Sequence, residues 1–424
     1  MRCFNMNMKE LGISKRDLKR RNRLQVIKAV REVGPVSRVD IAERLCITRA
    51  AVTVIVNEMI EAGILRELGE EIFYHKSQIH KGRRKVLIDF VPTFCYALGV
   101  HISSQKVIVG ISTVTNETMG KREVEISPET TREEIIDTIC KLSEELAEYN
   151  TISLDKVTAM GIGVMPEMAV KMGVAPSEKL ADYDSLVEVF EERMNIPTFA
   201  ANAVPLMCLE TFNIREHVEV PYNMVMIAAD ENAYHIGAVV NNEACERYLA
   251  DSTSINKMCV NPGGRIHEGH CNGSVMAELT PYAIAYKASD CYCEALTPSL
   301  YEMTGGNGEH ITLAQMLTAM ENGDAEIEEL ASSLLHEFCL MLNNLKVIYN
   351  AEKVCLYNFG FSERNMDQIR TCLIANAYGD LADIIEQYDR KGKRLSRGCS
   401  AYALQCGFFD NCYIMPDDNE NDED

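Results

Sequence analysis

Five histidine and cysteine side chains between residues 267 and 293 could together bind a metal ion. They are His267, His270, Cys271, Cys291 and Cys293. Zinc in proteins takes nitrogen and sulfur ligands of this kind in a tetrahedral arrangement. The spacing of the five, however, matches no standard zinc pattern. We therefore expect no metal or other cofactor, and keep a zinc site at these residues as the alternative.

The stretch LGVHISSQKVIVGI, residues 98–111, has the strand–turn–strand form in which some proteins hold a phosphate group. Phosphate binding needs close approach of backbone N–H groups, which glycine permits. This turn has no glycine and no carboxylate, and carries His101, Ser103, Ser104 and Gln105 instead. These side chains either line a changed ligand cleft or merely close the turn, and we expect the second.

A third group of residues, near the N-terminus, could read DNA. Residues 15–31 pair a basic cluster with apolar side chains at helical spacing, and Gly34-Pro35 ends that helix. A second helix follows in SRVDIAERL, with Ser37 and Asp40 in the positions of a capping box. A third follows in residues 48–65. Three short helices with a tight turn before the third predict a helix-turn-helix.

The third helix would direct side chains that can reach base edges outward, namely Thr48, Arg49, Ala50, Thr53 and Asn57. The run ILRELGEEIFYHKSQ alternates in the manner of a two-stranded wing. After it, Gly82, Arg83 and Arg84 could enter a minor groove or grip phosphates. The alternative is a helical interaction module whose basic residues form only a solvated face.

The distribution of charge separates this head from the rest of the chain. The first 88 residues hold 19 Lys and Arg against 10 Asp and Glu, whereas the remainder holds 23 against 53. A basic head on an acidic body suggests that the head meets a polyanion. The final segment PDDNENDED, residues 416–424, cannot bury a core, and we expect it to be a disordered acidic tail.

The composition is that of a folded, multi-domain protein. The chain has 424 residues, of which 47% are hydrophobic and 25% charged. No apolar run reaches the ~18 residues of a membrane span, and the N-terminus lacks the apolar core of a signal peptide. We therefore expect a cytoplasmic location with no membrane partner. Most of the 16 cysteines sit singly in apolar stretches, where they act as small hydrophobic residues.

Beyond the head, β-rich segments alternate with long helical patterns, which indicates an α/β body. The predicted strands are 96–102, 106–114, 157–165, 222–229, 234–241 and 353–357, and the predicted long helices are 131–149 and 326–347. No internal repeat is visible in the sequence.

These patterns resemble the ROK family (repressors, open reading frames and sugar kinases). The head matches its winged helix at IAERL (41–45), TRAAVT (48–53), EAG (61–63) and GRR (82–84). Val54 departs from the family, where a basic or polar residue is common. Residues 86–415 resemble the two-lobed, actin-like body of the ROK sugar kinases. This implies a winged helix over 1–88, a first lobe over 89–202, and a second lobe with the C-terminal helix over 203–415.

The resemblance also shows what the body lacks for phosphoryl transfer. The turn at 101–105 matches the family's first phosphate loop without its glycines, and residues 230–237 match the second with only Gly237 left. Asn202, or Ala203 if the alignment slides by one, stands in the place of the catalytic base, and neither can accept a proton as a carboxylate does. Asn202 would instead cap the following helix. The sugar-holding run matches residues 254–257, including Ser254 and Lys257.

The resemblance therefore implies a DNA-binding transcription regulator, a repressor of sugar-related genes, whose kinase-like body has no activity. Its partners would be an operator in double-stranded DNA, a second copy in a homodimer or higher homo-oligomer, and a sugar or sugar-phosphate effector. The possible effector cleft comprises His101, Ser103, Ser104, Gln105, Asn202, Ser254 and Lys257. The alternatives are a divergent sugar kinase that uses ATP, and a constitutive DNA-binding or scaffold protein without an effector.

Overall fold

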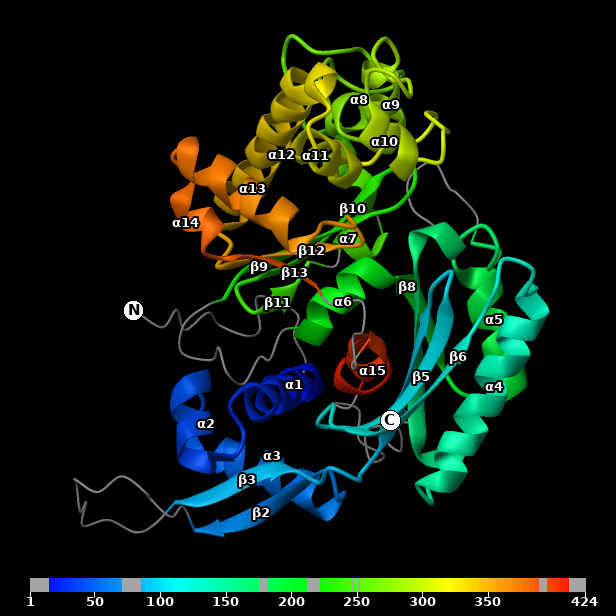
Figure 1. Cartoon of the computed structure of the whole chain (residues 1–424). Coiled ribbons are helices and arrows are strands. Elements are labelled where there is room, and N and C mark those ends of the chain that lie inside the picture. The colour runs from blue at the N-terminus through cyan, green and yellow to red at the C-terminus, as the bar shows by residue number, and fades with distance from the viewer. Residues whose placement is uncertain are drawn as a thin grey trace.

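The computed structural model describes residues 15–70, 85–174, 182–211, 222–245, 247–250, 252–388 and 395–411. Over these residues the chain has the predicted α/β architecture, with a small helical head and a body built on two five-stranded sheets (Figure 1). Gly82, Arg83, Arg84 and the acidic tail lie outside the described residues. Among the residues described, no helix combines the length and the apolar character that crossing a membrane would require.

The head is a three-helix unit with a small antiparallel sheet. Its elements are α1 (Lys15–Val33), β1 (Val36–Ser37), α2 (Arg38–Leu45), α3 (Arg49–Glu61), β2 (Leu65–Glu70) and β3 (Val86–Phe90). Helix α2 begins where Ser37 Oγ accepts the backbone N–H of Asp40, and α3 begins where Thr48 Oγ1 accepts that of Ala51. These side chains satisfy N–H groups that the first turn of a helix leaves free.

The wing sheet includes a strand that the sequence did not indicate. Strand β2 lies in the first part of the run predicted as the wing and pairs with β3, while residues 71–78, the rest of that run, lie outside the described residues. Strand β3 also pairs with β1, so the sheet order is β1-β3-β2. The local alternation of polar and apolar residues could not identify this partner, because the two strands are separated by residues 71–85 in the chain.

The first sheet of the body has the order β6-β5-β4-β7-β8. Its elements are β4 (Tyr96–Ile102), β5 (Lys106–Thr113), β6 (Thr118–Glu125), α4 (Arg132–Tyr149), β7 (Val157–Val164), α5 (Asp184–Met194) and β8 (Thr198–Asn202). Helix α4 starts at the predicted capping box, in which Thr131 and Glu134 bond reciprocally. Helices α4 and α5 cover the outer face of the sheet (Figure 1).

The second sheet, of order β11-β10-β9-β12-β13, repeats the arrangement of the first. Its strands are β9 (Met224–Ala229), β10 (Tyr234–Val240), β11 (Glu243–Ala244), β12 (Lys353–Tyr357) and β13 (Ile385–Gln387). In both sheets a three-stranded antiparallel set is followed by two parallel strands. The duplication is structural, because the two halves share no visible sequence repeat.

Helices cover the second sheet on the side away from the first lobe (Figure 1). The longest, α12, carries the apolar face expected from five residues of the sequence: Leu330, Leu334, Phe338, Leu342 and Leu345. Four of them are buried, and Leu330 is half-buried. The helices of this half are α7 (Arg247–Ala250), α8 (Val275–Glu278), α9 (Pro281–Ala288), α10 (Pro298–Met303), α11 (Leu313–Glu321), α12 (Glu328–Tyr349), α13 (Glu363–Ala375) and α14 (Gly379–Ala382), with a 3-10 segment at Ser252–Lys257.

Two helices, α6 (Ala203–Thr211) and α15 (Leu395–Leu404), lie between the sheets. Helix α15 follows the second lobe in the chain and was grouped with it from the sequence, but it packs on β4, β5 and β7 of the first sheet. The packing is close enough to require glycine. A Cβ at Gly99 would lie 2.0 Å from the Ser396 carbonyl oxygen, and one at Gly398 would lie 1.9 Å from that of Leu206.

The head shares a hydrophobic core with the end of the chain. The π-helical turn Gln405–Phe409 continues α15 and packs against the head. The rings of Phe90 and Phe409 meet edge to face with centroids 5.7 Å apart, and the Arg31 guanidinium lies 4.3 Å from the centre of the Phe409 ring. The head is therefore attached to the body by buried aromatic packing as well as by the chain itself.

Candidate nucleic-acid interface and interlobe site

Helix α3 presents a polar stripe to solvent. Its buried face, made of Val52, Ile55, Val56 and Met59, packs on the other helices of the head. All five predicted reading residues are exposed: Thr48, Arg49, Ala50, Thr53 and Asn57. Ala50, Thr53 and Asn57 lie at helical spacing on the face opposite the buried one, whereas Thr48 and Arg49 lie at the N-terminal end of the helix.

Val54 also lies on the outward face of α3, and 55% of its surface is exposed. An apolar side chain at this position can contact a thymine methyl group but can donate no hydrogen bond. Val54, the residue that departs from the family pattern, therefore lies on the exposed surface of α3 with the predicted reading residues.

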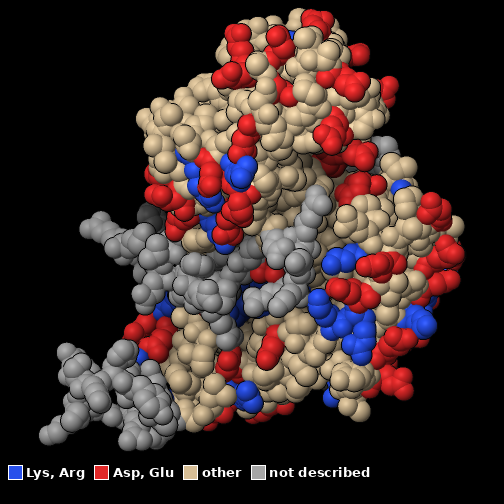
Figure 2. Space-filling model, viewed as in Figure 1, with Lys and Arg blue, Asp and Glu red and all other residues tan. Residues whose placement is uncertain are grey.

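Several basic side chains of the head form ion pairs with glutamates of the head. Arg49 Nη2 lies 3.4 Å from Glu43 Oε1, and both side chains are mostly exposed. Glu58, on α3, accepts from Lys19 and from Arg23, which is itself nearly buried. Pairs between exposed side chains, such as Arg49 and Glu43, contribute little to stability and can exchange partners readily. Figure 2 shows acidic side chains spread over both lobes of the body, consistent with the division of charge along the sequence.

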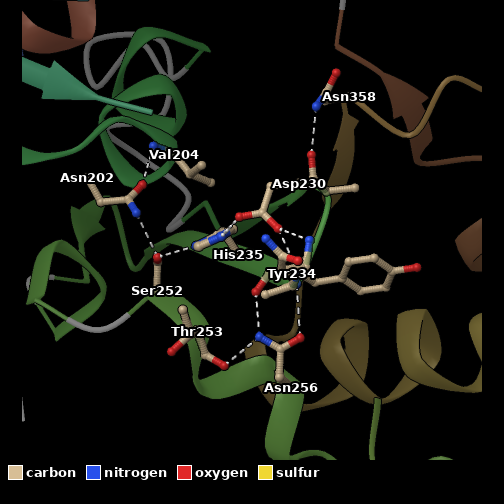
Figure 3. A network of polar contacts seen from close by, with 12 residues as sticks. Asn202, Val204, Asp230, Tyr234, His235, Ser252, Thr253, Asn256 and Asn358 are labelled. Atoms are coloured by element: carbon tan, nitrogen blue, oxygen red, sulfur yellow. Dashed lines mark hydrogen bonds and ion pairs between the residues drawn. The ribbon is translucent and has the colours of Figure 1, made fainter. Parts of the chain in front are cut away.

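The interlobe site is built around His235, on β10, and is a continuous hydrogen-bonded network (Figure 3). Asn202 Nδ2 donates to Ser252 Oγ at 2.9 Å. Ser252 Oγ lies 2.8 Å from His235 Nδ1, and His235 Nε2 lies 2.9 Å from Asp230 Oδ2. Ser252 and His235 are buried. The network joins the last residue of β8, in the first lobe, to the second sheet.

The chemistry of Asp230 fixes the direction of its bond with His235. Burial raises the pKa of Asp230, but hydrogen bonds from His235 and from the backbone N–H groups of Asn232 and Ala233 outweigh it, so the pKa is lowered. An ionised carboxylate can only accept, so His235 Nε2 carries a proton and donates it to Asp230. At the other end of the network, Ser252 Oγ accepts from Asn202 Nδ2.

Asn202 also caps the helix that follows it, as the sequence predicts. Its Oδ1 accepts the backbone N–H of Val204 at 2.9 Å, in the first turn of α6. Both polar atoms of the side chain are therefore engaged, Nδ2 with Ser252 and Oδ1 with the helix. The Asn202 amide thus contributes to cohesion between the lobes and to the start of α6.

Asn256 fills the neighbouring part of the site. Its Oδ1 accepts the Tyr234 N–H at 2.9 Å, and its Nδ2 donates to the carbonyls of Tyr234 and Thr253 at 2.8 and 2.9 Å. The two residues predicted from this segment lie outside this network: Ser254 is half-buried and the Lys257 side chain is exposed. The polar side chains of this network therefore bond to one another and to the backbone within the protein.

The turn after β4 closes on itself. Ser103 Oγ donates to the Lys106 carbonyl at 3.0 Å and accepts the Lys106 N–H at 3.3 Å, while the Ser104 N–H donates to Glu167 Oε1 at 3.3 Å. The backbone carbonyl of Gln105 accepts from Ile126. These contacts favour the interpretation that the side chains close the turn, and they leave the turn apart from the His235 network.

His101 is fully buried on β4, and neither ring nitrogen has a hydrogen-bond partner within the described part of the chain. Burial, with a smaller contribution from the charge of Lys106, lowers the pKa of His101 to about 4. The ring is therefore neutral at pH 7. Its position on β4, paired with Ile108 and Gly163, places it in the sheet itself and not at the open turn.

The five candidate zinc ligands do not come together. Within the described residues, no group of three His, Cys, Asp or Glu side chains is arranged to hold a metal. The rings of His267 and His270 are in contact, but the Cys271 thiol donates to the Lys257 carbonyl and that of Cys291 to the Ala288 carbonyl. The residues present do not fit a tetrahedral zinc site.

An ion cluster stabilises the same loop region. Lys287 Nζ pairs with Glu278 and lies 3.2 Å from Glu337 Oε2. Glu278 Oε1 accepts the Arg265 N–H at 2.6 Å, and Glu337 Oε1 accepts from Asn261 Nδ2 at 2.9 Å. Both carboxylates are almost completely buried. The loop that contains His267 and Cys271 is thus tied to α8, α9 and α12 by charge.

The sequence interpretation left Asp230, His235, Ser252 and Asn256 out of the candidate site. A signal for three of them was present, because Asp230, His235 and Asn256 stand in segments that match the family's phosphate and sugar loops. Ser252 carried no such signal. Its role depends on the contact with Asn202, 50 positions earlier in the chain, which local sequence does not encode.

Comparison with known sequences identifies relatives among transcription regulators. The chain is 21% identical over 195 residues to the DNA-binding transcriptional dual regulator NagC of Escherichia coli K12 and, to the same extent, to the N-acetylglucosamine repressor of Escherichia coli O6:H1. The match covers 45% of this chain and 46% of each relative, so it spans about half the length of the curated relatives. No protein-family profile matches the chain.

Solved structures extend the comparison to nearly the whole chain. A ROK family transcriptional regulator described as a homologue of the Escherichia coli MLC protein superposes with a TM-score of 0.59 at 15% identity, covering 92% of this chain and 98% of that one. The chain therefore has the fold of this ROK regulator. A ROK hexokinase from Thermus thermophilus covers 73% of this chain with a TM-score of 0.51 at 13% identity, and 99% of that chain is matched. At 15% and 13% sequence identity, the similarity to these two ROK structures establishes the fold.

Proposed function

We propose that the protein is a sequence-specific DNA-binding transcription regulator, acting as a repressor of sugar-related genes. The observation that carries the proposal is the exposed stripe on α3, where Thr48, Arg49, Thr53 and Asn57 face solvent on the helix that follows the tight turn. Two findings support it. The sequence relatives include a DNA-binding regulator and an N-acetylglucosamine repressor, and the ROK regulator fold covers the head as well as the body.

We propose further that the body has no kinase activity. Asn202, in the place of the base, uses both of its polar atoms in hydrogen bonds. Asp230 carries a negative charge in the segment that would face a polyphosphate, and its pKa is lowered. A negative charge there repels the phosphates of ATP. The second candidate function, a sugar kinase, rests on the ROK hexokinase fold, and robust ATP turnover on a panel of sugars would establish it.

Binding of the full chain to genomic fragments tests the main proposal. The wild-type protein should bind selected fragments with an affinity that falls steeply as salt rises, because phosphate contacts release counterions. Arg49→Ala should weaken the selected site more than bulk DNA. Replacement of Arg83 and Arg84 should weaken many sequences alike. An absence of salt-dependent affinity for any fragment would show that the head has another role.

The partners follow from the same proposal. A homodimer would place two heads on a pseudo-palindromic operator, and a sugar or sugar phosphate bound in the cleft would change their spacing. Sedimentation of the chain with and without operator measures the stoichiometry. Thermal-shift measurements against sugars and phosphosugars then distinguish an effector-controlled regulator from a constitutive DNA-binding protein, because only the first gains stability from a ligand.

A further inference from the structure

Arg38 connects three elements of the head through one guanidinium group. It is the first residue of α2, directly after the cap Ser37. Its Nη2 donates to Asn57 Oδ1 at 2.9 Å, and its Nη1 donates to Glu67 Oε1 at 2.8 Å. Asn57 lies on the exposed stripe of α3 and Glu67 lies on the wing strand β2. The side chain therefore ties the recognition surface to the wing.

The contact with Arg38 sets the orientation of the Asn57 amide. A guanidinium has only N–H donors, so the atom that faces it must be the amide oxygen and not the nitrogen. The Asn57 Nδ2 group then points away from Arg38, and within the described residues it has no hydrogen-bond partner. An unrestrained asparagine could turn over and present either atom. In this protein the contact with Arg38 holds the Nδ2 donor of Asn57 in one direction.

The position of Asn57 makes this orientation important. On the helical wheel it lies between Thr53 and Ala50, in the middle of the outward face of α3. The acceptors available on base edges in the major groove are purine N7, guanine O6 and thymine O4. A fixed N–H donor at the centre of the face can discriminate between these edges and the cytosine N4 amino group, which itself donates.

Resting on the proposed DNA-binding function, we propose that Arg38 is a specificity-determining positioning residue, which holds the Asn57 amide so that α3 offers a fixed donor to an acceptor on one base edge. The pairing with Glu67 keeps the guanidinium in place, because it offsets the charge that would otherwise draw Arg38 to a phosphate. Arg38 Nε is buried and lacks a hydrogen-bond partner within the described residues. A buried N–H group without a hydrogen-bond partner costs free energy, and such a cost is typical of side chains whose position serves function.

The test uses the full chain and an operator selected from random DNA by the wild-type protein. Each base pair of the operator is substituted in turn, and the dissociation constant is measured by fluorescence anisotropy at fixed salt. Arg38→Met keeps the aliphatic stem but cannot donate. We expect Arg38→Met and Asn57→Ala to lose roughly tenfold discrimination at the same base pair. The double variant should lose no more than Asn57→Ala alone, because the two residues act as one unit.

Arg44→Met is the matched control. Arg44 also lies on α2 and also pairs with a glutamate, Glu32, at 2.8 Å, but it has no contact with Asn57. The Arg44→Met substitution removes the same positive charge as Arg38→Met, and it should lower the affinity for all base-pair variants of the operator equally. Asn57→Asp supplies a second variant, because it retains an acceptor for Arg38 while removing the donor. Asn57→Asp should therefore lose the same discrimination even if Arg38→Met folds poorly.

The outcomes separate this inference from the function on which it rests. If the wild-type protein binds no sequence selectively, both the proposed function and this inference are wrong. If it binds selectively but Arg38→Met weakens every base-pair variant by one factor, as Arg44→Met does, Arg38 acts through charge or folding and the inference alone is overturned. A uniform loss in Asn57→Ala would likewise overturn it, because Asn57 would then contact a phosphate.

Discussion

The side chain of Asn202, at the end of the first sheet, donates a 2.9 Å hydrogen bond to Ser252 in the other half of the body. This bond continues through His235 to Asp230, so one chain of hydrogen bonds joins the two lobes. The side chains that meet between the two sheets therefore hold the lobes together.

Removal of the Ser252 hydroxyl should destabilise the body. Ser252→Ala leaves both Asn202 Nδ2 and His235 Nδ1 without their partner, and a buried polar group left unsatisfied costs roughly 1–3 kcal/mol. We expect a loss of this size in the free energy of unfolding, measured by urea denaturation. Ser254→Ala removes a hydroxyl from the same 3-10 segment outside the network and should change stability by less than about 0.5 kcal/mol. Equal losses in the two variants would contradict the network.

The buried His101 should make the stability of the protein depend on acid. Its pKa is about 4 in the folded chain because of burial, against 6.5 for an unperturbed histidine. Between these values the unfolded chain binds a proton that the folded chain does not, so stability falls as pH decreases from 6.5 toward 4. The full shift corresponds to about 3 kcal/mol.

His101→Leu should remove this component of the pH dependence. Urea unfolding at pH 7 and at pH 4.5 measures it, as the difference in pH dependence between variant and wild type. His267→Ala provides the control, because His267 is exposed and its replacement should leave the pH dependence unchanged. If His101→Leu and the wild type lose the same amount of stability on acidification, the prediction is wrong. The His101 ring would then gain a hydrogen-bond partner in the folded protein, or take up a proton there without a cost in free energy.

Lys287 should be required for folding of the loop region near the candidate zinc ligands. Lys287→Met leaves Glu278 and Glu337 buried without their cation, and breaking a buried ion pair in this way costs about 3–5 kcal/mol. Lys141→Met removes an exposed lysine whose partner among the described residues is Glu145, and should have almost no effect. Combining Lys287→Met with Glu278→Gln and Glu337→Gln should recover part of the loss.

A chelator tests the alternative that a metal stabilises this loop. It should leave the melting temperature unchanged if charge, and not a metal, stabilises the loop.

Local sequence predicted the elements well and their long-range partners poorly. The bounds of β4 and β12 and the capping box of α4 follow from runs of β-branched residues and from one Thr–Glu pair. These signals act over a few residues. The pairing of β2 with β3 and the packing of α15 on the first sheet depend on contacts between distant segments, which no local periodicity in the sequence encodes.

The same limit applies to the candidate sites. The exposed face of α3 was predictable because a helix repeats every 3.6 residues, so the spacing of Ala50, Thr53 and Asn57 places them on one side of it. The interlobe network was predictable only in part. Asn202 was placed by its likeness to a family motif, whereas its bonds to Ser252 and His235 arise from how two sheets meet.

Gly398 should be essential to the packing of α15 between the lobes. A Cβ at this position would lie 1.9 Å from the Leu206 carbonyl oxygen of α6, so Gly398→Ala must push the two helices apart, and overpacking of this kind costs roughly 1–3 kcal/mol or more. Because α15 continues into Phe409, which packs on the head, we expect faster amide hydrogen exchange in α1 as well as a lower melting temperature. Gly379→Ala is the control, since no atom lies within 4 Å of its Cβ position. Unchanged exchange in α1 alongside a lowered melting temperature would show that α15 stabilises the body without transmitting its shift to the head.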